Sequence, residues 1–421
     1  LEKTVLIFTK TLKIRINVPS EQETLLRQMT EQYRQACNFI SEYVFTHSFD
    51  LNFFSLNKVL YRNIRGKFRL KSQLAQSSIK TVIARYNTVK EQLLEHPYRY
   101  KDEKGEWQSI PKTLEWLFKP VYFSRPQTDL VRNRDYSFVE NGSLLSINTL
   151  GERIKCTYER EHFKEYFDGS WRFGTAKLVE LNGLWYLHIP VTREKEDFKK
   201  ENVKHIVGID RGLRFLSVSY DEEGKTEFIS GKKIATKRNK FLELRRQLQA
   251  KGTKSARRRL KAISGRENRW MSDVNHQISK TLVRKYGKDT LFVLEDLTGV
   301  SFDERNLSRT AKLYRELAQV KRFSQRYDLR SWSFYQLEQF LKYKAQETGS
   351  EVLRVSAKYT SQRCPVCGRI HKQSRDHNRH LYSCPCGYKS NDDRVGAMNI
   401  QNLGKRWLSG EKNPRYKKDN N

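Results

Sequence analysis

The sequence predicts a multidomain protein of mixed α/β class. Its 421 residues are enough for two or three domains that each bury a core. Some stretches alternate apolar with polar residues, which is the period of a half-buried strand, while others repeat apolar residues every three or four positions, which is the period of an amphipathic helix. Because both periods occur in each half of the chain, we expect strands and helices in each domain.

The first half of the chain predicts a β module that is interrupted by a helical insert. Residues 3–18 alternate as a strand with a charged outer face. At Ser20 the period changes, and Ser20 with Glu23 three positions later predicts a capping box at the start of a helix. Helical patterning resumes and ends at Pro97, after which charge and aromatic residues mix without a clear period. Strand-like segments return at residues 143–150, 153–158 and 175–191.

The second half predicts a β-meander followed by helices and two further strands. The meander covers residues 203–230 and a basic helical region covers 232–270. A strand of the buried type is expected at 290–297, an amphipathic helix at 331–350 and a short strand at 351–357. The aromatic residues of that helix, Trp332, Phe334 and Tyr335, are interpreted as helix core. The highly charged residues 302–329 are expected to form a mobile flap.

The charge of the chain predicts a polyanionic partner. Lys and Arg number 81 against 48 Asp and Glu, a formal net charge of +33, and they occur all along the chain. An anionic membrane would require an amphipathic anchor, a lipidation signal or an apolar span, and none is evident. The aromatic content of 12% suits a surface that stacks on bases while cations neutralise phosphates. Composition alone would fit a ribosomal or a transposon protein equally well.

The basic region 232–270 is the candidate surface for phosphate contacts. It holds fifteen Lys and Arg residues and only two acids. Phe241, Leu244 and Leu248 share one face, which leaves the other face to cations. The predicted nucleic-acid-binding residues are Arg245, Arg246, Lys254, Arg257, Arg258 and Arg259. The alternative is an ordinary solvated helix face.

Four of the six cysteines predict a structural zinc site. Cys364, Cys367, Cys384 and Cys386 fall within 23 residues, whereas Cys37 and Cys156 stand alone. Clustered thiols of this kind favour metal over disulfides in a cytosolic protein, which agrees with an intracellular location. Four thiolates suit tetrahedral zinc. The second pair is one residue shorter than the usual spacing, so either Cys384 completes the site or His380 or His377 does. Coincidental free thiols are the alternative.

Three acids, each at the end of an apolar element, predict a divalent-metal site. These are Asp210, Glu295 and Asp393, with Gly208 and Gly212 leaving room around Asp210. Phosphodiester hydrolysis by two Mg²⁺ ions, or Mn²⁺ in their place, requires oxygen ligands of this kind. Asp296 and Asp392 are excluded because a strand would point each to the face opposite its neighbour. The alternative for any single acid is a solvated strand terminus.

Four motifs in order resemble those of TnpB proteins and the related miniature type V-F CRISPR effectors. They are "GIDRG", "LEDLTGV", "YTSQRCPVCG" and "DDRVGAMNI", and the resemblance covers roughly residues 205–405. It implies Asp210, Glu295 and Asp393 as catalytic residues and magnesium ligands, with the four clustered cysteines as zinc ligands. The family usually reads D-x-N-A-A-x-N-I in the last motif, where this chain has Val395 and Gly396.

The resemblance also implies the division of the chain. It implies an RNase H-like RuvC nuclease domain with an inserted zinc ribbon, plus an N-terminal wedge domain resembling a β-barrel that carries a helical recognition insert. The expected boundaries are 1–19 and 116–200 for the wedge domain, 20–115 for the recognition insert, 201–357 and 390–405 for the nuclease, 358–389 for the ribbon that binds target nucleic acid, and 406–421 for a basic flexible tail.

The function implied by the resemblance is that of an RNA-guided DNA endonuclease. Guide RNA and target double-stranded DNA are the expected partners, cleavage is expected beside a short adjacent motif, and no membrane partner is expected. The resemblance also implies a location in the cytoplasm of a prokaryote, in association with the nucleoid. An RNA-guided repressor that does not cut and an unguided RuvC-like nuclease are the alternatives. Whether the guide comes from a CRISPR array or a transposon, and whether the chain is a monomer or a homodimer, stay open.

Overall fold

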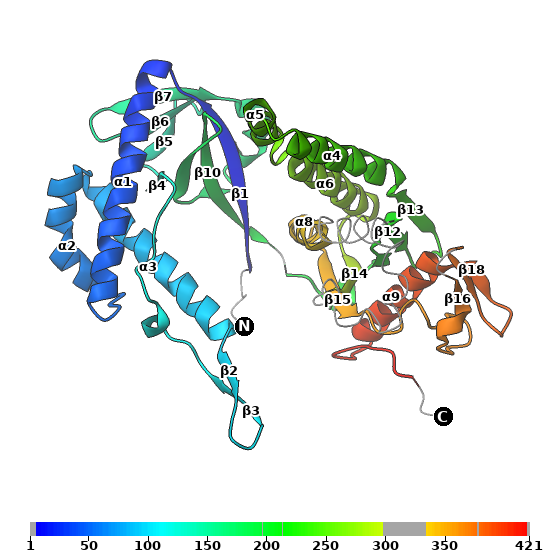
Figure 1. Ribbon diagram of the computed structural model, residues 1–421. Helices are drawn as coiled ribbons and strands as arrows, with labels where there is room; N and C mark the ends of the chain where they lie inside the picture. Colours follow the sequence, from blue (N-terminus) through cyan, green and yellow to red (C-terminus); the bar gives the residue numbers. More distant parts are fainter. Residues whose placement is uncertain (1–5, 196, 213, 298–333, 377–378, 419–421) are drawn as a thin grey trace. The chain divides into compact units, whose positions relative to one another are not determined.

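The computed structural model describes residues 6–195, 197–212, 214–297, 334–376 and 379–418 (Figure 1). The chain divides into two compact units: residues 7–194, here called the N-terminal unit, and residue 6 with the described residues from 195 onward, here called the C-terminal unit. The flap expected at residues 302–329, Trp332 and the alternative ligand His377 lie outside the described residues. Over the described ranges, no helix has both the length and the apolar character needed to cross a bilayer.

The N-terminal unit is an eight-stranded sheet with three helices inserted after its first strand. The helices are α1 (Ser20–Thr46), α2 (Phe53–Phe68) and α3 (Ser72–Glu95). The strands are β1 (Leu6–Asn17), β4 (Gln127–Leu130), β5 (Tyr136–Val139), β6 (Leu144–Asn148), β7 (Arg153–Tyr158), β8 (Arg172–Phe173), β9 (Ala176–Leu181) and β10 (Leu184–Lys195). Their order is β4-β9-β10-β1-β7-β6-β5, with β8 paired to β10. The predicted strands and helices of this half are confirmed.

The predicted capping box at the start of α1 is wrong. Pro19 is the N-cap residue, and its carbonyl accepts from the backbone N–H groups of Gln22 and Glu23 at 2.9 and 3.2 Å. No side chain caps the helix, and Glu23 instead pairs with Arg27 at 2.8 Å. Because the proline ring holds φ near the helical value, the helix starts one residue earlier than Ser20 would set it.

The C-terminal unit is built on a five-stranded sheet covered by helices on both faces (Figure 1). Strands β11 (His205–Asp210), β12 (Phe215–Tyr220) and β13 (Thr226–Ser230) form the predicted antiparallel meander, and β14 (Thr290–Asp296) and β15 (Glu351–Ser356) run parallel to β11. The order is β13-β12-β11-β14-β15. Helices α6 (Arg266–Tyr286) and α8 (Phe334–Glu347) pack on one face, and α9 (Asp392–Leu408) packs on the other.

Strand β14 shows why this sheet is buried on both sides. Phe292 and Leu294 belong to the cluster formed with α6 and α8, whereas Leu291 and Val293 belong to the cluster formed with α9. All four are at most 1% exposed. A strand whose side chains enter two apolar layers in alternation has a continuous apolar sequence. The apolar run at residues 290–297 predicted a buried strand for this reason.

The basic region between β13 and β14 is divided among three helices. These are α4 (Lys232–Lys251), α5 (Lys254–Ile263) and α6. Gly252 and Gly265 separate them with φ of +62° and +73°, in the left-handed region that favours glycine.

A small three-stranded module lies between β15 and α9 in the sequence. Its strands are β16 (Arg375–Asp376), β17 (Leu381–Ser383) and β18 (Lys389–Asn391), and it carries the four clustered cysteines. The remaining elements are the two-stranded hairpin β2 (Tyr98–Lys101) and β3 (Trp107–Ile110), and 3₁₀ turns at Leu114–Trp116, Arg160–Phe167, Lys200–Asn202 and Lys372–Ser374.

The segment after α9 is anchored, which corrects the expectation of a flexible tail as far as residue 418. Tyr416 is 5% exposed and packs in the cluster beneath α9. Its hydroxyl donates to the carbonyl of Asn399 at 2.8 Å, and the guanidinium groups of Arg363 and Arg406 lie 4.7 and 5.6 Å from its ring centre. One buried aromatic residue in a basic segment was not distinguishable from a solvated one by its sequence context.

Two glycines allow α9 to lie directly on the sheet. A Cβ at Gly208 would lie 2.2 Å from the carbonyl oxygen of Ala397, and one at Gly404 would lie 2.4 Å from a methyl group of Val293. The role expected for Gly208, to leave room around Asp210, is therefore wrong: the room it leaves is occupied by the backbone of α9.

We expect Gly208→Ala to lower the free energy of unfolding by about 1–3 kcal/mol or more, because helix and strand must separate to admit the methyl group. Chemical denaturation of the full chain measures this. Gly66→Ala is the matched control, since a Cβ there meets nothing within 4 Å, and this helical position should gain up to about 1 kcal/mol. Equal stability of the two variants would contradict the close packing of α9.

Candidate functional site

Asp210 and Glu295 lie side by side at one edge of the central sheet. The parallel register of β11 and β14 pairs Ile209 with Leu294, so the next residue of each strand is one of the two acids. Neighbouring strands are about 4.8 Å apart. Both carboxylates are half-buried. Sequence reasoning had placed them at strand ends, and the register brings them together.

Asp393 reaches the same place from the start of α9. The side chain of Asn391 caps this helix by accepting from the backbone N–H groups of Asp393 and Arg394, each at 3.0 Å. One turn further along, a Cβ at Gly396 would lie 2.7 Å from Oδ2 of Asp210. The first turn of α9 therefore lies against Asp210, which is how an acid nearly two hundred residues away approaches the sheet edge.

The carboxyl group of Asp210 is affected by burial and by both other acids. Burial raises the pKa of Asp210 well above its usual range, and the neighbouring carboxylates of Glu295 and Asp393 raise it further. Burial also raises the pKa of Glu295, against the opposing effect of the Thr360 hydroxyl, which donates to its Oε1. Like charges held together out of water are unfavourable without a cation. The donor set is thus one that suits hard divalent ions.

Asp210 is the acid whose pKa is raised by the carboxylates of both others. In the described parts of the chain, two sets of residues have ligand atoms that all lie within 4.8 Å of one another: the four cysteines, and His380 with Asp392 and Asp393. The three carboxylates of Asp210, Glu295 and Asp393 do not form such a set. The three acids are therefore near one another without being gathered around one point.

Asp392 was excluded from the site on the ground that strand alternation would point it away from Asp393, and this reason is wrong. Both residues are in the first turn of a helix, so strand alternation does not separate them. Asp392 is fully buried, and its carboxylate is paired there: Nε of Arg375 donates to it at 2.8 Å, and Nδ1 of His380 lies 3.4 Å away. The side chain of Asp393 is 18% exposed. Asp296, by contrast, is exposed at the end of β14, as alternation predicted.

Sequence reasoning missed the cation beside the acids. Arg375, from the small module, bridges Asp392 and Asp393, with a terminal nitrogen 3.6 Å from Oδ1 of Asp393. Its charge opposes the rise in pKa of both Asp210 and Glu295. In the sequence, Arg375 is recognisable only as an arginine midway between the two cysteine pairs. Many zinc modules have such an arginine without any contact to a neighbouring acidic site.

A buried ion pair holds the strand ends in place. Arg211 follows Asp210 and donates to the backbone carbonyl of Glu295 at 2.6 Å and to Glu338 of α8 at 3.1 Å. The side chains of Arg211 and Glu338 are 1% and 7% exposed. Removing one partner of a buried pair leaves an uncompensated charge. The pair thereby ties β11, β14 and α8 together directly behind the acids.

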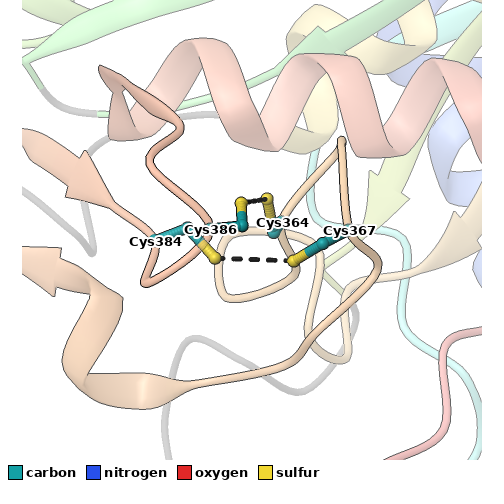
Figure 2. A group of neighbouring side chains, drawn as sticks. All are labelled: Cys364, Cys367, Cys384 and Cys386. Carbon is teal, nitrogen blue, oxygen red and sulfur yellow. Dashed lines mark hydrogen bonds between the residues drawn. The ribbon is translucent and has the colours of Figure 1, made fainter.

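The four clustered cysteines converge on one point, as Figure 2 shows. The Sγ atoms of Cys364 and Cys386 are 3.7 Å apart, those of Cys367 and Cys384 are 3.5 Å apart, and all four lie within 4.8 Å of one another. Tetrahedral zinc with Zn–S bonds of about 2.3 Å places its sulfurs about 3.8 Å apart. The cluster is therefore compatible with zinc, and the shorter second pair supplies its ligands in full.

The two cysteine turns are alike except for length. Gly368 donates to the carbonyl of Cys364 at 3.0 Å, and Gly387 donates to that of Cys384 at 2.9 Å, with φ of +77° and +92°. His380, one of the alternative zinc ligands, lies beside Asp392 and Asp393 instead of joining the sulfurs. A turn that is one residue shorter thus still aims its two thiols at the same point.

Comparisons with known proteins point to one group. The model of the Cas12f1-like TNB domain matches residues 334–400, and that of a probable transposase matches residues 188–298. The chain is a relative of the TnpB and Cas12f1 proteins. The CRISPR-associated endodeoxyribonuclease Cas12f1 of Sulfoacidibacillus thermotolerans is 24% identical over 90% of this chain and 92% of its own length. A TnpB-like protein of Methanocaldococcus jannaschii is 28% identical over 59% of this chain and 84% of its own length.

Solved structures of this group share the fold. The chain superposes on Cas12f1 from a complex with guide RNA and target DNA with a TM-score of 0.54 at 12% identity, over 96% of this chain and all of that one. CasPhi-2 (Cas12j), bound to crRNA and phosphorothioate-DNA, gives a TM-score of 0.52 at 12% identity, over 97% of this chain and 93% of that one. The predicted mixed α/β class is confirmed.

The two departures from the motif usual in TnpB relatives have structural reasons. Val395 is fully buried in a cluster with Cys364, Tyr382 and Cys384, so it joins α9 to the cysteine module by apolar contact. Gly396 is where α9 meets the carboxylate of Asp210. The later Asn399 of the motif donates to the backbone carbonyls of Thr360 and Arg363, both at 2.7 Å.

The predicted phosphate-binding residues are not equivalent. Arg246, Lys254 and residues 257–259 are exposed on α4 and α5. Arg245 instead pairs at 2.6 Å with Glu267, whose other oxygen faces the buried Arg238 at 3.4 Å. Sequence patterning placed Arg245 on the outer face because it could not show that α6 folds back against α4.

We expect Gly396→Ala to reduce affinity for divalent ions at the acids by roughly tenfold or more. The added methyl group would displace the carboxylate of Asp210, and displacement of a ligand or its support costs affinity on this scale. Titration of the full chain with Mn²⁺, followed by electron paramagnetic resonance, measures this. Ala397→Gly, on the same turn, is the comparison. Unchanged affinity of Gly396→Ala would contradict the contact.

We expect Cys384→Ser to lose the zinc bound by the purified chain, since structural sites need all four ligands. Metal content by plasma mass spectrometry measures the loss. Cys156→Ser removes a buried thiol of the other unit and should leave the zinc content unchanged, as should His380→Ala. Zinc retained in Cys384→Ser but lost in His380→Ala would show that the histidine is the ligand.

Proposed function

We propose that this protein is an RNA-guided DNA endonuclease whose cleavage site is formed by Asp210, Glu295 and Asp393. The observation that carries the proposal is the convergence of these three acids, from segments far apart in sequence, on the carboxylate of Asp210. Its support from relatives is the naming of Cas12f1 as an endodeoxyribonuclease and of an Escherichia coli relative, 25% identical, as a putative RNA-guided DNA endonuclease.

The proposed chemistry is hydrolysis of a phosphodiester at two Mg²⁺ ions, or Mn²⁺. The bound ions would activate water and stabilise the leaving oxygen. Asp210, Glu295 and Asp393 would hold these ions. Thr360 orients Glu295 by its hydroxyl, Asn391 orients Asp393 by capping α9, and Arg375 offers a positive charge beside Asp393.

The domain roles follow the same proposal. Residues 201–357 and 390–405 would form the RNase H-like RuvC domain, and residues 358–389 the zinc ribbon that binds target nucleic acid. The β-sheet of the N-terminal unit would be the wedge domain at residues 1–19 and 116–200, and its helices the recognition insert at 20–115. Together these would hold guide RNA and a short motif beside the target, while base pairing would specify the sequence.

Cationic surfaces of the C-terminal unit would hold the phosphate backbone. One is formed by Arg246, Lys254 and residues 257–259 on α4 and α5. Another is a cavity of about 1000 Å³ between the first cysteine turn and the anchored segment after α9. Its lining includes Arg363, Arg369, Arg406, Arg415, Lys417 and Lys418, with Glu411 as the acid. Neutralising phosphates in this way contributes affinity without sequence preference.

We expect Asp210→Asn to abolish cleavage of matched DNA while sparing its binding. The substitution keeps the size of the side chain but removes the central negative ligand, so the rate should fall about a thousandfold or more. The measurement is cleavage of labelled duplex DNA by the purified chain with its copurified RNA and Mg²⁺. Binding is followed by mobility shift in Ca²⁺.

Asp296→Asn, one residue after Glu295 on the exposed side of β14, is the matched control and should cut normally. Cutting unchanged in Asp210→Asn would refute the assignment of the site. If wild-type protein with RNA and Mg²⁺ binds matched DNA but never cuts it, the chain is a guided repressor. Cutting that persists after RNase treatment would identify an unguided nuclease.

A further inference from the structure

The hairpin β2–β3 exposes every one of its eight strand residues. It follows α3 at the far end of the helical insert, and its register pairs Tyr98 with Ile110 and Lys101 with Trp107 (Figure 1). A two-stranded hairpin without core contacts is only marginally stable in water. Aromatic and apolar side chains placed on it are therefore not accounted for by folding of the chain itself.

One face of the hairpin presents a pair of stacked tyrosine rings. Tyr98 and Tyr100 have ring centres 6.1 Å apart and planes inclined by 21°, and they are 47% and 38% exposed. Trp116 extends this surface, with its ring centre 5.8 Å from that of Tyr98. Successive rings with open faces are the arrangement on which unpaired bases stack.

The opposite face combines a ring with cations. Trp107 is 70% exposed, and Nζ of Lys101 lies 5.5 Å from its ring centre. Strand alternation places Arg99 on this same side. On the first face, Nζ of Lys112 lies 5.9 Å from the ring of Trp116. Each aromatic surface thus has a lysine ammonium over one of its rings, available to meet the phosphates of a stacked strand.

The acids of the hairpin are confined to its turn. Asp102 accepts from the backbone N–H groups of Lys104 and Glu106 at 3.0 and 2.8 Å, so it shapes the turn. Lys101 and Lys112 lie against the rings instead, and Arg99 is on the same face as Lys101. A surface for another protein would not require this separation, whereas a polyanion with flat bases is matched by it.

We propose that the hairpin of residues 98–110, together with Trp116, is a stacking platform for unpaired bases of bound RNA. This proposal rests on the proposed function, in which RNA is a partner. It specifies that the hairpin recognises a single-stranded stretch of that RNA. Bases would stack on Tyr98, Tyr100 and Trp107 without sequence preference, because every base offers a flat π-face.

The test compares two triple variants of the full chain. Tyr98→Ala/Tyr100→Ala/Trp107→Ala removes the rings, and Tyr98→Phe/Tyr100→Phe/Trp107→Phe keeps them. The probe is a fluorescent oligouridine of about 16 nucleotides, a length typical of stacking sites, with duplex RNA of equal length as reference. The alanine variant should lose about tenfold or more in affinity for oligouridine and little for duplex. The phenylalanine variant should bind as wild type.

The salt dependence of binding should be the same in all three proteins, since no cation is removed. Because the hairpin buries nothing, circular dichroism should show an unchanged fold. Oligouridine affinity unchanged in the alanine variant would overturn the platform. A dimer in wild type that dissociates in this variant, at unchanged RNA affinity, would identify a self-association surface instead.

Failure of the hairpin and failure of the guided-nuclease proposal are distinguishable. Wild-type protein that binds neither RNA overturns both. Wild-type protein that cuts matched DNA only with its RNA, while the alanine variant binds oligouridine normally, overturns the platform alone.

Discussion

The close contact of α9 with the central sheet is the constraint on which the candidate site depends. Gly208 and Gly404 remove the side chains that would hold helix and strands apart, and Gly396 brings the helix backbone against Asp210. With ordinary side chains at these positions, the first turn of α9 would stand farther from the sheet edge. The acid it carries, Asp393, would then be out of reach of the acids on β11 and β14.

A chain of polar contacts connects this packing to the cysteine module. Tyr416 donates to the carbonyl of Asn399, the amide of Asn399 donates to that of Thr360, and the Thr360 hydroxyl donates to Glu295. These hydrogen bonds thus join Glu295 to the segment before the first cysteine pair, to α9 and to the segment after α9. Such networks favour one arrangement over others because an unpaired buried group is costly.

The cysteine module contributes to the acids as well as to its own folding. Val395 links α9 to the buried cysteines, and Arg375 carries a positive charge from the module to Asp392 and Asp393. The site itself is locally acidic, whereas the rest of the chain has an excess of basic residues. Under the proposed function, divalent cations would neutralise the acids and bind phosphate oxygens of the nucleic acid.

The amino-acid sequence by itself determined the kinds of local structure and chemistry. Period-two and helical patterns located the strands of the five-stranded sheet and most helices, and the thiol spacing predicted that four cysteines form a cluster. Asp210 and Glu295 were recognised at the ends of apolar strands, whereas Asp393 lies in the first turn of α9 and not at the end of an apolar element. These signals are local, because they depend on neighbours within a few residues. The cap of α1, the pairing of Arg245 with Glu267 and the burial of Tyr416 were not predictable in this way.

Only the tertiary structure decided which residues meet. Strand register set Asp210 beside Glu295, glycines set the depth of α9, and the fold of the module brought Arg375 to Asp393. Each of these depends on contacts between segments a dozen to nearly two hundred residues apart. Periodicity along the chain holds no information about such distances, because they follow from how separate surfaces pack and not from the order of residues within any one of them.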